Sequence, residues 1–401
     1  MYKRLIQVLA TILSLILLAG IVSSCKEPSY SAEDFYRAQI KAIAPDGSKI
    51  IFSGARDRFL MYESYLVGAE ASDFLRLPLP EKYEDLSLSR GGKAILYRVD
   101  QTIFVMSPDD VSVMAIYENA FLGRSAPCFS PDGETVYFLG EESRLYRRPI
   151  SSTYKWMITS FEVVRFYVVG DGSRIILHKR EDRKSELMVM NADGTDLKKI
   201  TEMENPYEFS FSPDGNSMLM YSIEGKELYY IDVAQNIVTP LPFDYARLSD
   251  EPFQFTPDGD RILICAGFGE ELLHVYSMKT DGTDRQKIID RVIWDYHVSL
   301  PDERIVNIGY INNKTELCST NIDGTDDIIL SLTDSGYYEE AKISFSADGS
   351  RIFFNPMVGD MITIRFDTSQ SRSITKYADP AIDENNPPPG FTRGTDNCVR
   401  D

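Results

Sequence analysis

The chain has 401 residues, 43% of them hydrophobic and 26% charged, a composition typical of a globular protein with a sizeable core. Its formal net charge of -19 at pH 7 argues against nucleic acid or an anionic lipid surface as the ligand, because both carry the same sign of charge. The charge suits a basic partner or cations, although solubility alone would also account for it.

The N-terminus has the features of an export signal. Two basic residues, Lys3 and Arg4, precede an apolar run over residues 5–18, and small residues lead up to Cys25. This junction resembles the lipobox of bacterial lipoproteins, which implies that residues 1–24 are a signal peptide and that the Cys25 thiol is lipidated. An uncleaved signal-anchor helix is the alternative, and either arrangement would tether an exported protein to a membrane.

Residues 25–38 would then form the lipidated cysteine and a short polar tether. The residue after the cysteine is Lys26 and not Asp, which by the sorting rule of enterobacterial-type lipoproteins favours the outer membrane. We therefore expect a lipid-anchored protein of the cell envelope, facing the periplasm or the cell surface.

One motif, Ser-Pro-Asp-Gly or a close variant, then returns roughly every 43 residues. It lies between two short runs that both predict strands. Pro fixes φ, Asp can bond to nearby backbone, and Gly takes the positive φ that closes a tight hairpin. The structural turns assigned in this way are Asp46 and Gly47, Asp132 and Gly133, Asp214 and Gly215, Asp258 and Gly259, and Asp348 and Gly349.

A third strand and a second turn follow each hairpin. The second turn reads Asp-Gly-Thr-Asp where it begins at Asp193, Asp281 and Asp323, and a fourth strand completes the unit. Four antiparallel strands in about 43 residues make one blade of a β-propeller, and blades bury both faces only by stacking around an axis. The sequence therefore predicts an all-β propeller over residues 39–377. Eight blades are expected, with seven as the alternative if the degenerate unit at Ser89 is not a full blade.

Several units depart from the pattern. The second unit has lost Pro and Asp from its first turn. In the seventh, Trp294, Tyr296 and Val298 alternate out of phase with the other units, which predicts a one-residue register slip or a reshaped turn. The eighth unit supplies four strands of its own, so the ring would close without a blade shared with the N-terminus. Residues 378–401 are Pro-rich and polar and are expected to form a loosely attached tail.

The Ser-Pro-Asp-Gly hairpin followed by an Asp-Gly hairpin resembles the repeat of the TolB-like propellers, a WD40-like or PD40 repeat also found in tricorn-type and prolyl-oligopeptidase-type peptidases. The resemblance covers residues 39–377 and implies a fold more than a function. TolB itself has an N-terminal α/β domain for which the tether is too short, so we do not expect TolB. The peptidases keep their triad in a separate domain, and neither its G-x-S-x-G motif nor room for it is found.

Residues that could bind a metal or act in catalysis are few. The histidines, His178, His274 and His297, fall in different units, and only His297, on an axis-proximal strand, is a candidate ligand-binding residue. We expect no catalytic residue, no metal and no cofactor.

The cysteines and the Asp-Gly-Thr-Asp turns also predict structure more than chemistry. Cys128, Cys265 and Cys318 fall in strands of different units and predict buried thiols, with disulfides, including one to Cys398, as the alternative. The turns lack the spacing of a twelve-residue calcium loop, so hairpins are expected there.

Both turn types of a blade project from one rim, and the links between blades project from the other rim, which is rich in Arg and aromatic residues. Such residues form the hot spots of protein interfaces, although they could instead pack the links. The candidate ligand-binding residues of this rim and the axis are Arg56, Arg124, Tyr207, Arg247, Trp294, Tyr296, His297 and Tyr338, with Tyr245, Phe268 and Tyr337 in the same loops.

Together these features predict a membrane-anchored envelope lipoprotein whose propeller is a non-enzymatic binding or scaffolding module. Its partner would be an envelope protein or a peptidoglycan-associated one, and not nucleic acid. A glycan-binding or lyase-like glycan-active protein is the alternative, and a purely structural lipoprotein is a third.

Overall fold

The structure is a computed structural model that describes residues 37–55, 62–68, 74–121, 125–169, 172–181, 184–203, 206–222, 227–242, 244, 247–267, 273–299, 303–311, 314–333, 342–345, 351–355, 362–365 and 371–373. These residues form eight four-stranded antiparallel sheets, and within each sheet the strands lie side by side in chain order. The predicted all-β propeller of eight blades is confirmed.

Blades one to four take the N-terminal half of the propeller. Blade one comprises β1 (Arg37–Ile43), β2 (Lys49–Ala55), β3 (Tyr62–Gly68) and β4 (Leu75–Leu77). Blade two comprises β5 (Glu84–Leu88), β6 (Ile95–Val99), β7 (Thr102–Met106) and β8 (Val113–Tyr117). Blade three comprises β9 (Cys128–Phe129), β10 (Thr135–Leu139), β11 (Leu145–Pro149) and β12 (Trp156–Met157). Blade four comprises β13 (Arg165–Val168), β14 (Arg174–Glu181), β15 (Lys184–Asn191) and β16 (Lys198–Met203).

Blades five to eight complete the ring. Blade five comprises β17 (Pro206–Phe211), β18 (Ser217–Ser222), β19 (Glu227–Asp232) and β20 (Ile237–Leu241). Blade six comprises β21 (Arg247–Phe255), β22 (Arg261–Gly267), β23 (His274–Lys279) and β24 (Gln286–Ile289). Blade seven comprises β25 (Val292–Ser299), β26 (Arg304–Ile311), β27 (Lys314–Asn321) and β28 (Ile328–Thr333). Blade eight comprises β29 (Lys342–Phe345), β30 (Arg351–Asn355), β31 (Ile362–Arg365) and β32 (Ser371–Ser373). Two short 3-10 helices, η2 (Arg90–Gly92) and η3 (Glu141–Ser143), lie in loops of blades two and three.

The first hairpin of blade five shows how the repeated motif closes each turn. Asp214 Oδ1 accepts hydrogen bonds from the Ser212 hydroxyl (2.6 Å) and from the Asn216 N–H (3.0 Å). The Ser212 Oγ in turn accepts the Ser217 N–H (2.9 Å), and Gly215 has a φ of 68°. The predicted turn residues Asp132, Gly133, Asp258 and Gly259 are arranged in the same way. At the first turn residue 44 is Ala, so Asp46 accepts both the N–H and the hydroxyl of Ser48, and Gly47 again has a positive φ. Asp348 and Gly349 lie outside the described residues.

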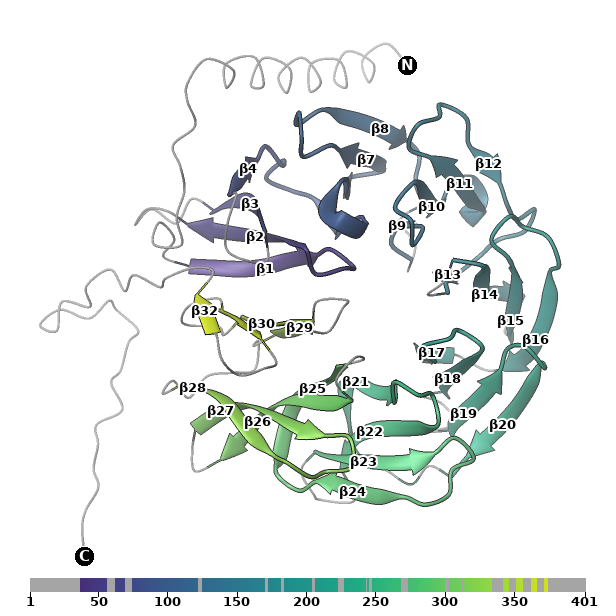
Figure 1. The fold of residues 1–401 in the computed structure, drawn as a ribbon. Coiled ribbons are helices and arrows are strands. Elements are labelled where there is room, and N and C mark those ends of the chain that lie inside the picture. Colours follow the sequence, from purple (N-terminus) through teal and green to yellow (C-terminus); the bar gives the residue numbers. More distant parts are fainter. Residues whose placement is uncertain are drawn as a thin grey trace, which may run out of the picture.

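The blades form a ring in which each first strand faces the centre and each fourth strand lies at the circumference (Figure 1). Neighbouring first strands contact one another, as β21 does with β17 and with β25. Apolar side chains are buried in layers between blades: Leu219 of blade five clusters with Ile262 and Ile264 of blade six. Stacking therefore buries both faces of a blade, as the repeat predicts.

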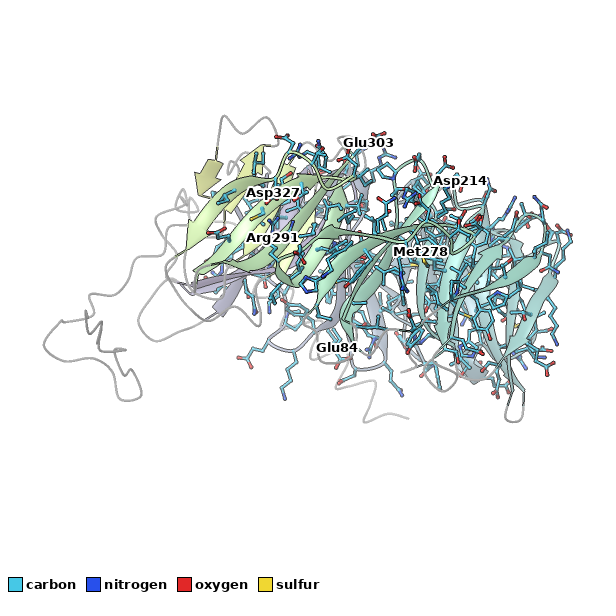
Figure 2. The ribbon with its side chains drawn as sticks, turned by 90° about the horizontal axis from the view of Figure 1, so that it is seen from below. Glu84, Asp214, Met278, Arg291, Glu303 and Asp327 are labelled. Atoms are coloured by element: carbon cyan, nitrogen blue, oxygen red, sulfur yellow. The ribbon has the colours of Figure 1, made fainter. Side chains whose placement is uncertain are left out.

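Seen edge-on, the ring is a flat disc with two rims (Figure 2). Asp214 and Glu303, from the β17–β18 and β25–β26 turns, lie at one rim, which we call the turn rim. Glu84, at the start of β5, lies at the opposite rim. We call this the link rim, because the links between blades and the loops between second and third strands lie there.

Blade eight closes the ring against blade one by packing alone. Phe353 of β30 is buried in one cluster with Ile50, Phe52 and Tyr65 of blade one, and β1 contacts β30. Strands β1 to β4 make blade one and β29 to β32 make blade eight, so neither blade mixes the two ends of the chain. The expectation of closure without a shared blade is confirmed.

The predicted register slip in blade seven is present as a β-bulge. The pairing of β25 with β26 shifts between Ile293 and Asp295, which leaves Trp294 as the extra residue. The first strands of blades one, two, five and six carry similar shifts, so the bulge is a recurrent device and not a peculiarity of blade seven.

A polar cluster lies where blade seven meets the link from blade six. Arg291, in the link between these blades, donates through Nε to Asn307 Oδ1 (2.9 Å) and pairs through both terminal nitrogens with Asp327 (Figure 2). Burial alone would lower the pKa of Arg291, but the hydrogen bond and charge of Asp327 outweigh it and raise that pKa. Glu316 is buried in the same cluster, and its Oε2 has no hydrogen-bond partner among the described residues.

Candidate interaction surface

The structure describes only part of the link-rim set that the sequence predicts. Tyr207, Arg247 and Trp294 lie on β17, β21 and β25, but their side chains are outside the described part of the chain. Arg56, Arg124, Tyr245, Phe268, Tyr337 and Tyr338 lie outside the described residues altogether. For these nine positions a ligand-binding role stays a prediction.

The prediction that Tyr296 binds a ligand is wrong, because its side chain is buried. Its side chain is 0% exposed in the cluster between blades six and seven, and its hydroxyl donates to the Leu263 carbonyl oxygen (3.2 Å). Gln254 of blade six also binds the neighbouring backbone, donating to the Tyr296 carbonyl (3.2 Å) and accepting the Val298 N–H (3.0 Å). A ligand cannot reach this ring, so the packing alternative holds at Tyr296.

Among the described residues, the histidines and cysteines form no shared site with acidic side chains. His297 is half-buried on β25 opposite Val306, and His274 Nδ1 lies 3.1 Å from the Arg291 carbonyl oxygen. Cys265 and Cys318 are buried, as predicted, whereas Cys128 is half-buried, and burial raises the pKa of Cys318 to about 11. Within the described ranges no group of three His, Cys, Asp or Glu side chains could hold a metal ion.

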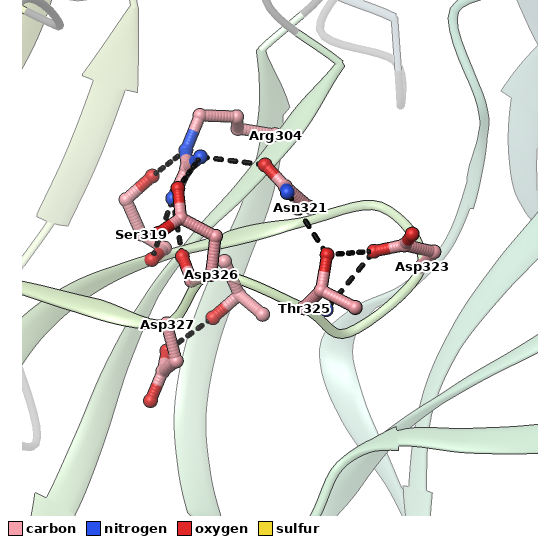
Figure 3. A network of polar contacts seen from close by, with 8 residues as sticks. Arg304, Ser319, Asn321, Asp323, Thr325, Asp326 and Asp327 are labelled. Carbon is pink, nitrogen blue, oxygen red and sulfur yellow. Dashed lines mark hydrogen bonds and ion pairs between the residues drawn. The ribbon is translucent and has the colours of Figure 1, made fainter.

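The Asp-Gly-Thr-Asp turns of the turn rim are closed by their own side chains (Figure 3). Asp323 Oδ1 accepts hydrogen bonds from the Thr325 N–H (2.9 Å) and hydroxyl (2.6 Å), which hold the pKa of Asp323 below its ordinary value. Arg304 pairs with Asp326 at the end of the turn (2.9 Å) and donates to Asn321 Oδ1 (2.5 Å). Asp193 and Asp281 bind Thr195 and Thr283 in the same way. This geometry supports the hairpin interpretation of these turns over a calcium loop.

Exposed apolar side chains gather on blades two and three instead. Of the eight exposed large hydrophobic side chains found among the described residues, five belong to these blades. They are Val113 (39% exposed), Phe121 (48%), Tyr154 (76%), Trp156 (48%) and Met157 (50%), whereas Leu197, Ile237 and Ile329 lie singly on blades four, five and seven. Val113, Tyr154, Trp156 and Met157, which we call the aromatic patch, lie on or beside the outer strands β8 and β12 (Figure 1).

Polar contacts join blades two and three beneath the aromatic patch. Arg148 is 8% exposed; it donates to the carbonyl oxygens of Ile116 in blade two and of Ser152 in blade three (2.7 Å to the latter). Burial lowers the pKa of Arg148. The Lys155 ammonium lies 3.9 Å from the centroid of the Tyr117 ring, a cation–π contact across the same blades. These contacts therefore join the two blades that carry the patch residues.

A pocket opens at the link rim between the same two blades. It has a volume of about 10 Å³, the size of one water molecule, and Phe121 forms part of its wall. Arg98 lies in it, donating to Asp85 (2.5 Å) and pairing with Glu84. Burial alone would lower the pKa of Arg98, but the bonds and charges of these two acids raise it. The pocket is lined by Asp85, Arg98, Ile103, Ala120, Phe121, Ser125, Pro127, Phe138 and Leu139.

Strained backbone accompanies this pocket. Asp85, in its wall, has a φ of 55°, and Glu142 and Ser143, in the β10–β11 loop beside it, have φ values of 54° and 53°. A non-glycine residue in this left-handed region costs on the order of 1–3 kcal/mol, and such strain tends to gather where a surface is shaped for function. The Glu141 N–H, donated to the Tyr117 hydroxyl (3.3 Å), helps to hold the loop in place.

The sequence carries a signal for this surface. Tyr154, Lys155, Trp156 and Met157 form a run without the alternation of a strand that is buried on one face, and Trp156 is one of only two tryptophans in the chain. The corresponding fourth strand of blade four, β16 (Lys198–Met203), is far more polar than this run. Consecutive large apolar residues on an outer edge strand therefore indicate an exposed patch.

The comparisons with known proteins bear on the fold. No family model and no curated protein matches the chain. A eukaryotic initiation factor is similar in structure, with a TM-score of 0.55 and 14% identity over 88% of this chain and 89% of that one. A prolyl endopeptidase gives a TM-score of 0.55 and 11% identity over 84% of this chain and 56% of that one.

TolB from Agrobacterium tumefaciens is also similar, with a TM-score of 0.38 and 19% identity over 55% of this chain and 84% of that chain. Identities this low show a shared fold alone and say nothing of substrate or partner. The chain is a β-propeller of four-stranded blades, and TolB, whose repeat its own motifs resemble, is among its structural neighbours.

Proposed function

We propose that this protein is a non-enzymatic binding module of the cell envelope that presents the link-rim pocket and the aromatic patch of blades two and three to a protein partner. The concentration of exposed apolar side chains on two adjacent blades is the observation that carries this proposal. Exposed apolar patches mark interaction sites, and Trp and Tyr supply much of the binding energy at protein interfaces.

The rigidity of this surface supports the same function. Arg148 and Lys155 tie together the two blades that carry the patch, so little conformational freedom would be lost when a partner binds. The loop that holds Glu142 and Ser143 is likewise tied to blade two by the hydrogen bond from the Glu141 N–H to the Tyr117 hydroxyl. A preformed surface of this kind suits a scaffold that binds a folded or extended partner without itself rearranging.

The envelope location is part of the proposal and rests on the sequence. Cys25 and the apolar run before it lie outside the described residues, and lipidation of that cysteine would tether the propeller to the outer membrane. No helix among the described residues is long and apolar enough to cross a membrane. The partner would be an envelope protein, including one associated with peptidoglycan.

Affinity capture with matched variants tests the proposal. The double variant Trp156→Ser with Met157→Ser removes the centre of the patch, and Ile237→Ser with Ile329→Ser removes equally exposed apolar side chains from blades five and seven. We expect a partner from envelope extract to be enriched by the native protein and by the control variant but not by the patch variant. Equal enrichment by both variants, at unchanged thermal midpoints, would refute the assignment of this surface.

A further inference from the structure

We infer that the partner engages the link rim of blades two and three through a short basic segment with an apolar side chain, which seats on Phe121 beside the pocket. This inference deepens the proposed function and rests on it. Two features support it: exposed acidic residues lie near Phe121, and the neighbouring basic side chains already contact other groups.

Three exposed acidic residues lie close to Phe121, either along the chain or next to residues that bond to its backbone. Glu118 lies three residues before it, and the Phe121 N–H donates to the Leu139 carbonyl (3.0 Å), which brings Glu141 close by. On the other side, the Ala120 N–H donates to the Gln101 carbonyl (2.8 Å), next to the exposed Asp100. None of the three carboxylates of Asp100, Glu118 and Glu141 has an ion-pair partner among the described residues. We call these three residues the acidic collar.

The described basic side chains of this region are already occupied. Arg98 pairs with Glu84 and Asp85, and Arg144 pairs with Glu142. Arg148 is buried among carbonyl oxygens, and Lys155 lies over the Tyr117 ring. These contacts leave the positive charges in place, but among the described residues of this region the acids Glu84, Asp85, Asp100, Glu118, Glu141 and Glu142 outnumber the bases Arg98, Arg144, Arg148 and Lys155 by six to four. The described part of this region is therefore net negative, in line with the net charge of -19, and suits a cationic partner.

The apolar part of the inference follows from Phe121 itself. Its ring is 48% exposed at the mouth of a pocket too small for a cofactor or sugar. A side chain packed onto this ring would gain apolar contact while lysines or arginines of the same segment meet the collar. A membrane surface fits less well, because the collar would lie against lipid headgroups and anionic lipid would be repelled.

Fluorescence anisotropy with defined probes tests the inference. The probes are three labelled short peptides of equal length: one of Lys, Leu and Ser, one with Glu in place of Lys, and one with Ser in place of Leu. The variants are Glu118→Lys with Glu141→Lys in the collar and Phe121→Ser. The charge control is Glu134→Lys with Asp260→Lys, exposed acids of the turn rim. Vesicles of zwitterionic and of anionic lipid are tested in parallel.

We expect the Lys-Leu peptide to bind, and to bind about tenfold more weakly to the collar variant and to the Phe121→Ser variant, because exposed charge pairs and one apolar contact each contribute modestly. Rising salt should weaken binding, and the charge control should leave it unchanged. An equal loss of affinity in the charge control would show that the peptide is attracted by the overall negative charge and not by the collar, which would overturn the inference. Equal binding of the Glu-Leu peptide, absence of peptide binding, or binding of vesicles instead would overturn the basic-segment inference. The capture experiment with the patch variants would still decide the proposed function independently.

Discussion

Two turn glycines in equivalent positions give a direct test of how the blades are joined. Gly215 and Gly259 have φ values of 68° and 76°, so alanine at either site is placed in the left-handed region at a cost of about 1–2 kcal/mol. Their surroundings differ. A Cβ on Gly215 would lie 2.1 Å from the Val169 Cγ1 of blade four, whereas a Cβ on Gly259 meets nothing within 4 Å.

The clash sets the expected difference between the two variants. Val169 is 2% exposed and belongs to the core between blades four and five, so it can move only by disturbing that core. Overpacking of this kind costs about 1–3 kcal/mol in addition to the strain. We therefore expect the free energy of unfolding to fall by about 1–2 kcal/mol for Gly259→Ala and by about 2–5 kcal/mol for Gly215→Ala.

Urea unfolding followed by circular dichroism measures both losses, and a second-site variant provides the control. Val169→Ala in the Gly215→Ala background should recover part of the loss, because it removes the clashing methyl group, and it should bring no recovery with Gly259→Ala. Equal losses for the two glycines, or no coupling with Val169, would refute the conclusion that turns of adjacent blades pack on one another.

Three further predictions concern buried and titrating groups. Arg148→Met should lower stability by about 1–3 kcal/mol, because it strips buried carbonyl oxygens of their donor; an unchanged urea midpoint would contradict the role of Arg148. Glu316→Gln should leave the thermal midpoint unchanged or raise it, since one carboxylate oxygen is buried without a partner, whereas Asp327→Asn should lower it. The hydrogen bond from Ser212 lowers the pKa of Asp214 in the folded state, so its stabilisation is complete above the unfolded pKa of about 3.9 and is lost as pH falls through the folded pKa. Unfolding curves of Asp214→Asn and the native protein should therefore converge at acidic pH, and a constant gap would count against this linkage.

The repeat could be predicted from the sequence because its information is local. A turn such as that of Asp214 and Gly215 needs one carboxylate, one hydroxyl and one residue with positive φ, all within a few positions. Stacking then follows, since one blade alone cannot bury two apolar faces. Even the worn turn of blade two keeps this chemistry, because the Ser89 hydroxyl accepts the Ala94 N–H (2.9 Å) and Gly91 has a φ of 74°.

The interaction surface could not be derived in this way, because exposure depends on which blade covers which side chain. Alternation divides a strand into two faces, but in a propeller both faces are buried. The alternation of β25 therefore predicts an accessible Tyr296, whereas the ring packs between blades six and seven. The contact between Arg291 and Asp327 joins residues far apart in the sequence, and no local pattern indicates it.

A photo-cross-linking scan around the circumference tests the proposed function most directly. A photoreactive residue is placed in turn at Val113, Trp156, Leu197, Ile237 and Ile329, the exposed apolar positions of blades two, three, four, five and seven, and adducts are measured in cells that make the protein. A partner bound to blades two and three should give adducts at Val113 and Trp156 and little at the other three positions. Adducts that are uniform around the disc, or strongest on blades five and seven, would contradict the proposal that the partner binds blades two and three.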